Sequence, residues 1–252
     1  MVAVHGYPDN HAVWDGVAAN LDQDHRLVAY DVRGTGASDK PVERDAYRLS
    51  ILLDDLIAVL DAIGSDRAVH LLGHDWGSVQ LWPALTHPRL AGRIASFTSI
   101  SGPALDHAAI WLRRLRDHPL GTLRQVADSY YAVLFQVPGL PEAAIRAGLL
   151  DRAIGTRPRA DQLNGLNLYR ANLRTRVRAN PQPIDRPVQV IAPRSDHFIT
   201  PRLALEAPRP FVAQLHTRVV DGGHWVIRER PDMIADCVRE FVARRPPQAR
   251  AR

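Results

Sequence analysis

The stretch Gly73-His74-Asp75-Trp76-Gly77 constrains the fold of this chain most, because it directly follows the apolar run Ala68–Leu72. A buried strand that ends in small-x-acid-x-small and continues into a helical pattern predicts a tight strand-turn-helix elbow. Such a turn leaves room only for glycine-sized neighbours, and it pushes the central side chain out above the sheet. We therefore expect the carboxylate of Asp75 to be presented at the end of a buried strand.

A carboxylate at this position favours one kind of chemistry. Its attack on an ester or amide gives a reactive anhydride, whereas its attack on a saturated carbon gives an ester that water can later cleave. We therefore expect Asp75 to be a nucleophile toward saturated carbon. The alternative is that Asp75 only caps the following helix, which is a common role for aspartate. The glycines on both sides of it argue against that alternative.

Short apolar runs alternate with helical patterns along most of the chain, which indicates an α/β fold with an open, mostly parallel sheet flanked by helices. Leu49 to Ile63 forms the clearest helical pattern, with one apolar face, and a last helix runs from Pro231 to about Ala243. The candidate strands are Val2–Val4, Leu27–Tyr30, Ala68–Leu72, Ile94–Ile100, Val188–Ile191 and Leu215–Val220.

The pattern changes between residues 104 and 183, where strand-like runs disappear and amphipathic helical segments follow one another. We interpret residues 104–183 as a helical cap inserted into a core formed by residues 1–103 and 184–252. Val2–Val4 already looks like an interior strand, so the leading edge strands of such a sheet are expected to be missing. A recorded start that is too late is favoured over a sheet that lacks its edge.

Composition excludes several classes of function. The formal net charge is +5, but the basic residues are nearly all arginine, with Lys40 the only lysine, and they are scattered among acids. Only Arg244–Arg252 is a basic run, and it is interpreted as a disordered tail, so no nucleic-acid partner is expected. The single Cys237 excludes a disulfide framework and fits a cytoplasmic protein. No stretch is long and apolar enough for a membrane span or a secretory signal.

Several motifs occur in an order that resembles the epoxide hydrolase and haloalkane dehalogenase branch of the α/β-hydrolase fold. They are His5-Gly6-Tyr7-Pro8, Asp31–Pro41, Gly73–Ser78, Ser195-Asp196 and Gly222–Trp225, and they cover essentially the whole chain. The resemblance implies an α/β-hydrolase core with a helical cap. The chain also resembles the hydrolase half of actinobacterial fusions in which such a domain precedes a short-chain reductase, so a reductase partner or fusion is an expectation.

The resemblance and the chain order together imply a nucleophile-acid-base triad. His224 follows the last expected strand in a Gly-Gly-His-Trp turn and is expected to be the general base. Asp196 follows the strand Val188–Ile191 and is expected to orient the imidazole. An acid after the preceding strand is the other option, and Asp106 is the nearest there. For His224 the alternative is a surface or packing histidine, and for Asp196 it is a solvated turn residue.

Water attack on the ester creates an oxyanion that needs hydrogen-bond donors. The backbone N–H groups of Tyr7 and Trp76 are expected to supply them. Pro8 is expected to shape the Tyr7 turn, and a cis peptide bond before it is one way of doing so.

The leaving group decides between the two activities of this branch. The resemblance implies that tyrosines of the cap donate to the oxygen of an opening epoxide, and Tyr169 resembles one of these positions. The other usually lies in a Tyr-Phe-Gln-x-Pro-Gly stretch, where this chain carries Leu134. Tyr130 or Tyr131, about one helical turn upstream, is expected to replace it. The alternative for all three tyrosines is packing.

The sequence therefore predicts a hydrolase that converts an epoxide to a vicinal diol through an aspartyl ester, with a small apolar substrate and water as its only partners. No cofactor or metal is expected, because no cluster has metal-ligand spacing and the glycines do not follow a dinucleotide pattern. Haloalkane dehalogenase and a degenerate, non-catalytic domain are the alternatives. The substrate pocket is expected to include Pro8, Trp111, Tyr130, Tyr131, Phe135 and Trp225, although Trp111 also fits a packing role.

Overall fold

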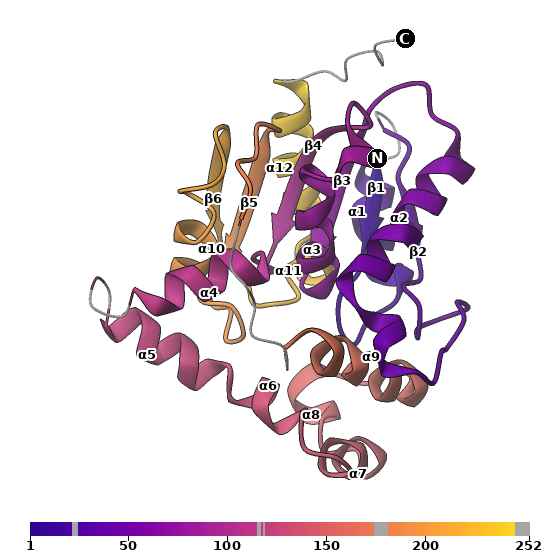
Figure 1. The fold of residues 1–252 in the computed structure, drawn as a ribbon, viewed down its shortest axis with the longest axis vertical. Coiled ribbons are helices and arrows are strands. Elements are labelled where there is room, and N and C mark those ends of the chain that lie inside the picture. The colour runs from indigo at the N-terminus through magenta and orange to yellow at the C-terminus, as the bar shows by residue number, and fades with distance from the viewer. Residues whose placement is uncertain (22–24, 115–116, 118, 174–180, 245–252) are drawn as a thin grey trace.

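Six parallel strands form one sheet in the order β2-β1-β3-β4-β5-β6 in the computed structural model, which describes residues 1–21, 25–114, 117, 119–173 and 181–244 (Figure 1). The strands are β1 (Val2–Val4), β2 (Val28–Tyr30), β3 (Val69–His74), β4 (Ile94–Ile100), β5 (Val188–Pro193) and β6 (Leu215–Val220). All registers are parallel, and β1 lies between β2 and β3. Since all strands run the same way, the turns after their carboxyl ends meet at one edge of the sheet.

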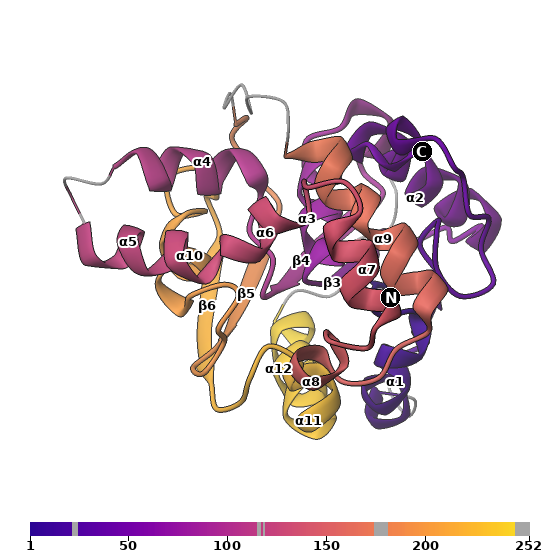
Figure 2. The same cartoon turned by 90° about the horizontal axis from the view of Figure 1, so that it is seen from below.

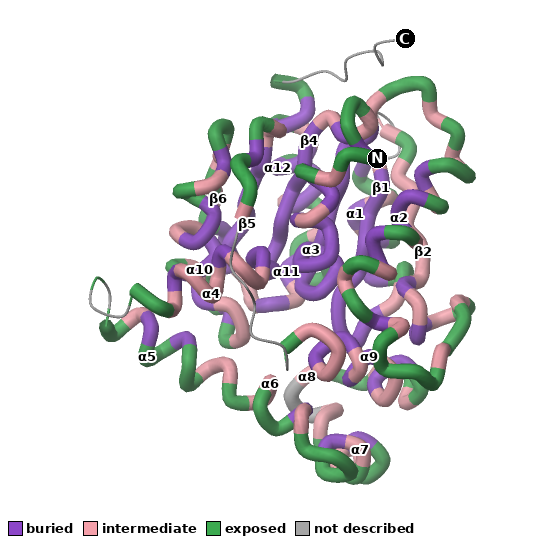
Figure 3. The backbone as a smooth tube through the Cα atoms, viewed as in Figure 1, coloured by how far each residue is buried: buried purple, intermediate pink, exposed green. Residues whose placement is uncertain are grey.

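Alternate residues of the strands enter two separate cores, one on each face of the sheet. On one face, Leu72 and Ile100 pack with residues of α1 (Asp15–Leu21), α11 (Val226–Glu229) and α12 (Pro231–Ala243). On the other face, Leu71 and Phe97 pack with residues of α2 (Leu49–Ile63), α3 (Trp76–Leu81) and α10 (Pro201–Glu206). Figure 3 shows that the central strands β1, β3, β4 and β5 are buried almost throughout, while the edge strands β2 and β6 are only partly buried. The near-continuous apolar character of the strands follows from this double coverage.

The helices of the fold begin and end at residues that the sequence marks. The apolar stripe of α2 is buried, and α2 ends at Gly64, whose φ of 61° is the left-handed conformation that glycine adopts readily. Pro231 occupies the first turn of α12. Short 3-10 helices cover η1 (His11–Trp14), η2 (Arg44–Tyr47), η3 (Trp82–Leu85) and η4 (Pro88–Leu90).

The helices between β4 and β5 gather beyond one end of the sheet, and we call them the cap helices (Figures 1 and 2). They are α4 (Leu105–Arg113), α5 (Pro119–Asp128), α6 (Tyr130–Leu134), α7 (Leu140–Arg146), α8 (Asp151–Ile154) and α9 (Arg159–Asn172). α9 contacts the core directly: the side-chain oxygen of Asn172 accepts a hydrogen bond from the N–H of Leu49, at the start of α2.

The predicted fold class is confirmed, and every predicted strand is present within about two residues of its expected bounds. The predicted disordered tail falls, from residue 245 on, outside the described residues. Within the described ranges, no helix has both the length and the apolar character that crossing a membrane requires.

Candidate active site

Asp75 lies at the turn between β3 and α3, in a backbone conformation that few residues adopt. Its φ is 52° and its ψ is −124°. A Cβ atom on Gly77 would lie 2.0 Å from the carbonyl oxygen of Val4, and one on Gly73 would lie 2.5 Å from the Cα of Ser78. The glycines of the motif are therefore required because neighbouring backbone occupies the space of any side chain. The strain at Asp75 is the kind that surrounding structure holds at functional sites.

The turns after β5 and β6 bring Asp196 and His224 to Asp75. His224 Nδ1 lies 3.1 and 3.0 Å from the two carboxylate oxygens of Asp196. His224 Nε2 lies 3.5 Å from Oδ2 of Asp75. All three side chains are buried. Because an ionised carboxylate only accepts hydrogen bonds, Nδ1 must carry a proton toward Asp196. The rival acid Asp106 instead lies 4.0 Å from His107 Nε2, at the start of α4.

Electrostatics inside this group favour a charged imidazole. Burial alone would lower the pKa of His224, but the charges of Asp196 and Asp75, and their hydrogen bonds to the ring, raise it to about 10. Burial would also raise the pKa of Asp196, but His224 and the N–H groups of Phe198 and Ile199 hold it below its usual value. The two acidic neighbours of His224 therefore favour the protonated form of its ring.

His224 has a further support that sequence reasoning missed. His74 is the last residue of β3, and its Nε2 donates to the carbonyl oxygen of His224 at 2.8 Å. Their ring centroids lie 4.9 Å apart. Because His74 directly precedes Asp75, one strand end positions both the carboxylate and the backbone that carries the imidazole. Its place within the elbow motif is the only signal in the sequence that could have revealed this role.

The N–H of Tyr7 donates to Oδ1 of Asp75 at 2.7 Å. The Tyr7–Pro8 peptide bond is cis, which is the conformation that the sequence analysis named as one way of shaping this turn. Gly6 permits this approach, since a Cβ there would lie 2.4 Å from the same Oδ1. Trp76 opens α3, so its N–H is one of the first-turn donors that lack an acceptor within the helix.

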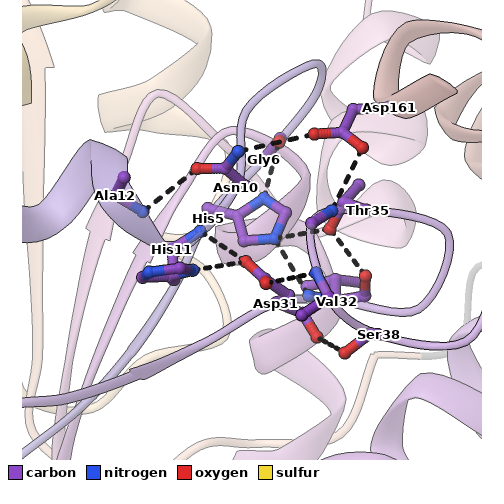
Figure 4. Close-up of polar contacts among 12 residues, drawn as sticks. His5, Gly6, Asn10, His11, Ala12, Asp31, Val32, Thr35, Ser38 and Asp161 are labelled. Atoms are coloured by element: carbon purple, nitrogen blue, oxygen red, sulfur yellow. Dashed lines mark hydrogen bonds and ion pairs between the residues drawn. The ribbon is translucent and has the colours of Figure 1, made fainter. Parts of the chain in front are cut away.

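His5 fixes the turn that carries Tyr7 (Figure 4). Its Nε2 accepts the N–H of Val32 at 2.9 Å, so Nδ1 carries the proton and donates to the carbonyl oxygen of Gly6 at 2.9 Å. Burial lowers the pKa of His5, which keeps the ring neutral for this pattern. His5 therefore has a structural role that joins the His-Gly-Tyr-Pro motif to the loop beginning at Asp31.

The rings of Tyr131 on α6 and Tyr169 on α9 meet edge-on, with centroids 6.0 Å apart. The ring of Tyr169 also packs edge-on against that of Trp76, with centroids 4.9 Å apart. Burial, together with the nearby charge of Asp75, raises the pKa of both hydroxyls. Both tyrosines therefore stay protonated near Asp75 and can donate a hydrogen bond.

Tyr130 and Leu134, which the prediction of a second tyrosine also involved, are exposed to solvent. Tyr130 is 65% exposed and Leu134 is 43% exposed, because α6 turns that side toward solvent. Tyr130 is thus not part of the pocket, which corrects the prediction. The ring of Tyr131, the other tyrosine considered, contacts that of Tyr169.

Aromatic rings surround these groups and close the site. Phe135 packs edge-on against Tyr169, with ring centroids 5.0 Å apart, and Trp225 packs against His224 at 4.9 Å. Phe198, two residues after Asp196, lies 4.9 Å from the ring of His224 and was missed. Its place beside the triad acid is the signal that could have revealed it.

Trp111 is a further correction. Its indole N–H donates to Glu206 at 2.9 Å, and its ring packs with Leu203 and Ala207. Trp111 therefore packs α4 against α10 instead of lining the site around Asp75, as its position on an apolar helical face already allowed.

A separate cavity of about 620 Å³ lies between α2, α3, α4 and α9. Its wall includes Val79, which follows Trp76 by about one turn of α3, together with Trp82 and Leu105. Neither Asp75 nor His224 lines it. It therefore lies beside the triad and not at it.

Residues 1–231 match the family described as the alpha/beta hydrolase fold. The chain belongs to this family. Among curated proteins, this alpha/beta hydrolase is 33% identical over 269 residues to a Mycobacterium tuberculosis protein named probable oxidoreductase EphD. The match covers 96% of this chain and 45% of that protein, so the chain spans about half the length of this relative. It is 29% identical to epoxide hydrolase A of the same species, with 96% of this chain and 89% of that protein covered.

Solved structures agree with the alpha/beta hydrolase architecture. An epoxide hydrolase of Bacillus megaterium in complex with an inhibitor superposes with a TM-score of 0.76 at 22% identity, over 96% of this chain and 93% of that one. Epoxide hydrolase A of Mycobacterium thermoresistibile gives a TM-score of 0.72 at 24% identity, over 98% and 92%. These likenesses concern the fold, and the resemblance to the epoxide hydrolase branch is confirmed by the relatives that carry that name.

Proposed function

We propose that this chain hydrolyses epoxides to vicinal diols through a covalent ester on Asp75. One observation carries the proposal: the buried Asp75-His224-Asp196 group lies next to Tyr131 and Tyr169, whose rings pack edge-on and whose hydroxyls stay protonated. The names of the epoxide hydrolase relatives support it.

In the first step Asp75 attacks a ring carbon of the epoxide. Oδ1 is held by the Tyr7 N–H, so Oδ2 is the attacking oxygen. A carbon–oxygen bond forms to Oδ2, and the ring carbon–oxygen bond breaks. The released alkoxide takes a proton from Tyr131 or Tyr169, which is general acid catalysis by neutral donors.

In the second step water cleaves the ester. Ester formation neutralises Asp75, which removes one of the two anions that raise the pKa of His224. The imidazolium can then return a proton to the tyrosinate left by the first step, and the neutral ring acts as a base toward water. The hydroxide attacks the carbonyl carbon of the ester, and the N–H groups of Tyr7 and Trp76 stabilise the oxyanion. Collapse expels the ester oxygen as an alkoxide, which takes the new carboxyl proton of Asp75 to give the diol. The ring keeps the proton taken from water, and one oxygen of the water remains on Asp75.

The same triad would serve a haloalkane dehalogenase, so the choice depends on the leaving group. A halide needs N–H donors around an anion, whereas an alkoxide needs a hydroxyl that can give it a proton. The two protonated hydroxyls beside Asp75 support the epoxide.

A single turnover in water labelled with ¹⁸O, on a panel of epoxides and haloalkanes, tests the proposal. The expected result is diol formation from an epoxide, with the label in the peptide that contains Asp75. Asp75→Asn should abolish turnover, while Asp54→Asn, an exposed carboxylate on α2 paired with Arg89, should retain it. Halide release without any diol would favour the dehalogenase. No label on Asp75, or full activity of Asp75→Asn, would refute the covalent mechanism.

We further propose that this chain corresponds to the hydrolase half of a hydrolase–reductase pair. The EphD proteins are named probable oxidoreductases, and the chain matches 45% of their length. Any reductase chemistry would then belong to their remaining part, and the residues described above would supply only the hydrolytic step.

A further inference from the structure

A buried carboxylate outside the triad joins three parts of the candidate site. Asp9, which is 3% exposed, lies just after the cis Tyr7–Pro8 bond. Its Oδ1 accepts a hydrogen bond from Nε of Arg157 at 2.5 Å. Its Oδ2 accepts one from the indole N–H of Trp225 at 2.7 Å. Arg157 lies two residues before the start of α9, and Trp225 directly follows His224.

The three groups form a compact unit with little access to water. The Arg157 side chain is 10% exposed, and its guanidinium carbon lies 5.8 Å from the centre of the Trp225 ring. The Trp225 ring in turn contacts His224 at 4.9 Å. A buried ion pair adds little net stability compared with apolar packing, but it holds its members in a defined geometry. The contribution of the Asp9–Arg157 pair is therefore expected in the positions of the chain segments that it joins.

A second carboxylate holds the same segment from the cap. Asp161 on α9 accepts the N–H of Gly36 at 3.1 Å, and its other oxygen lies 3.4 Å from Nδ2 of Asn10 (Figure 4). Asp161 is buried, and both of these donors are uncharged. The Gly6–Asn10 turn is therefore tied to α9 at Asn10 and to the segment before α9 at Asp9. This is the turn whose Tyr7 N–H holds Asp75.

We propose that Asp9 is a positioning residue that keeps the Tyr7 N–H and His224 in place while the cap helices are docked. The inference rests on the proposed function. The Tyr7 N–H orients Asp75 for formation of the ester, but in cleavage it must also stabilise the oxyanion, and His224 acts as a base only in cleavage. Loss of Asp9 therefore slows ester cleavage more than ester formation.

Asp9→Asn breaks one of the two ties, because Arg157 and Trp225 donate to different oxygens and asparagine replaces one of these oxygens with an NH2 group that cannot accept. The expected result is an ester on Asp75 that accumulates during steady-state turnover, seen by mass spectrometry of the intact protein. We expect kcat to fall by about tenfold or more, while ester formation in a single turnover changes by less than about threefold. Arg157→Gln should likewise slow ester cleavage more than ester formation. The double variant with Asp9→Asn should have a kcat little lower than that of either single variant.

Asp55→Asn is the matched control. It breaks a short, partly buried ion pair, with Arg33 Nη2 at 2.5 Å from Asp55 Oδ1, which joins a core loop to α2 without touching Trp225 or the cap. This variant should lower stability without accumulating the ester. An Asp9→Asn enzyme that slows both steps equally, or neither, would overturn the inference, as would the same ester accumulation in Asp55→Asn.

A measurement without substrate separates this inference from the proposed function. Amide hydrogen exchange at Tyr7, whose N–H is bonded to Asp75, should be faster in Asp9→Asn than in wild type or Asp55→Asn. Unchanged exchange would refute the positioning role even if the enzyme is active. If wild type forms no ester from any epoxide, the proposed function fails, and the exchange result still decides whether Asp9 positions the turn.

Discussion

Single residues of the site depend on neighbours that lie outside the motif carrying them. His224 is held by Asp196 through its ring and by His74 through its carbonyl oxygen. Asp75 is held by the Tyr7 N–H, and Tyr7 is in turn placed by the buried ring of His5. Each reactive atom therefore has its position fixed from two directions, which is what catalysis by preorganised groups requires.

The tyrosines give the first prediction at this scale. Tyr131→Phe removes one of the two proton donors near Asp75, so the rate of ester formation should fall by about a hundredfold, the range typical of general acid catalysis. Stopped-flow fluorescence with an epoxide in single turnover measures this rate. Tyr130→Phe is the control, because the ring of Tyr130 is exposed to solvent while it belongs to the same helix. Equal losses in both variants would show that the hydroxyl of Tyr131 is not the donor.

Sequence could predict the elbow because its geometry is local, and it could place Asp196 and His224 because each belongs to a turn after a strand. Gly73, Asp75 and Gly77 belong to one turn, and Asp196 and His224 each follow a strand that its apolar character reveals. The choice between Tyr130 and Tyr131 was not accessible in this way. In a five-residue helix the inward face is set by how the cap packs, and neighbouring positions differ by only about 100° of rotation.

Among the elements, α9 connects the site to the core most directly. It carries Tyr169 toward Asp75, Asp161 toward the Gly6–Asn10 turn, and Asn172 toward α2. Sequence indicated α9 only as one of several amphipathic segments, since its inward residues include polar side chains such as Gln162 and Asp161. Its burial therefore depends on partners that a hydrophobic pattern cannot reveal.

Asn172 gives a prediction at the scale of elements. The start of α2 has no capping side chain of its own, and Asn172 Oδ1 accepts the Leu49 N–H at 3.0 Å instead. Its Nδ2 donates to the carbonyl oxygens of Tyr47 and Leu168. Asn172→Ala should lower the free energy of unfolding by about 2 kcal/mol, the loss of a cap and two further hydrogen bonds.

Urea unfolding followed by circular dichroism measures this loss. Asn20→Ala, which removes an exposed bond within α1 to the carbonyl oxygen of Gly16, should change stability by less than about 0.5 kcal/mol. Similar values for the two variants would mean that Asn172 does not cap α2.

At the scale of the whole molecule, the order of the elements was more predictable than the side-chain contacts that join distant segments. The parallel sheet follows from alternating strand and helix patterns, and the loss of strand signals after residue 104 agrees with the run of helices between β4 and β5. These contacts were missed because they pair residues far apart in the chain. Arg157 and Asp9 are 148 positions apart, and Asp161 and Gly36 are 125 apart. No local pattern contains such pairs, so only the folded chain reveals them.

The triad also couples the folding of the whole chain to pH. The pKa of His224 is raised from its usual 6.5 to about 10 in the folded state, because Asp196 and Asp75 outweigh its burial. A raised pKa gives stability that is fully present below pH 6.5 and is lost as the pH rises toward 10. The pKa of Asp196 is lowered from 3.8, so its contribution is present above that pH and is lost on further acidification. The triad therefore stabilises the fold most between about pH 3.8 and 6.5.

Urea unfolding of wild type and His224→Gln at a series of pH values tests this coupling. The difference in unfolding free energy between the two proteins should shrink steadily from pH 6.5 to 10, because only wild type can lose the histidine proton. His197→Gln, at an exposed position next to Asp196, should run parallel to wild type over the same range. A difference that stays constant across this interval would mean that His224 is already neutral at pH 6.5 in the folded protein. The charged resting state, and with it the release of the base by ester formation, would then be wrong.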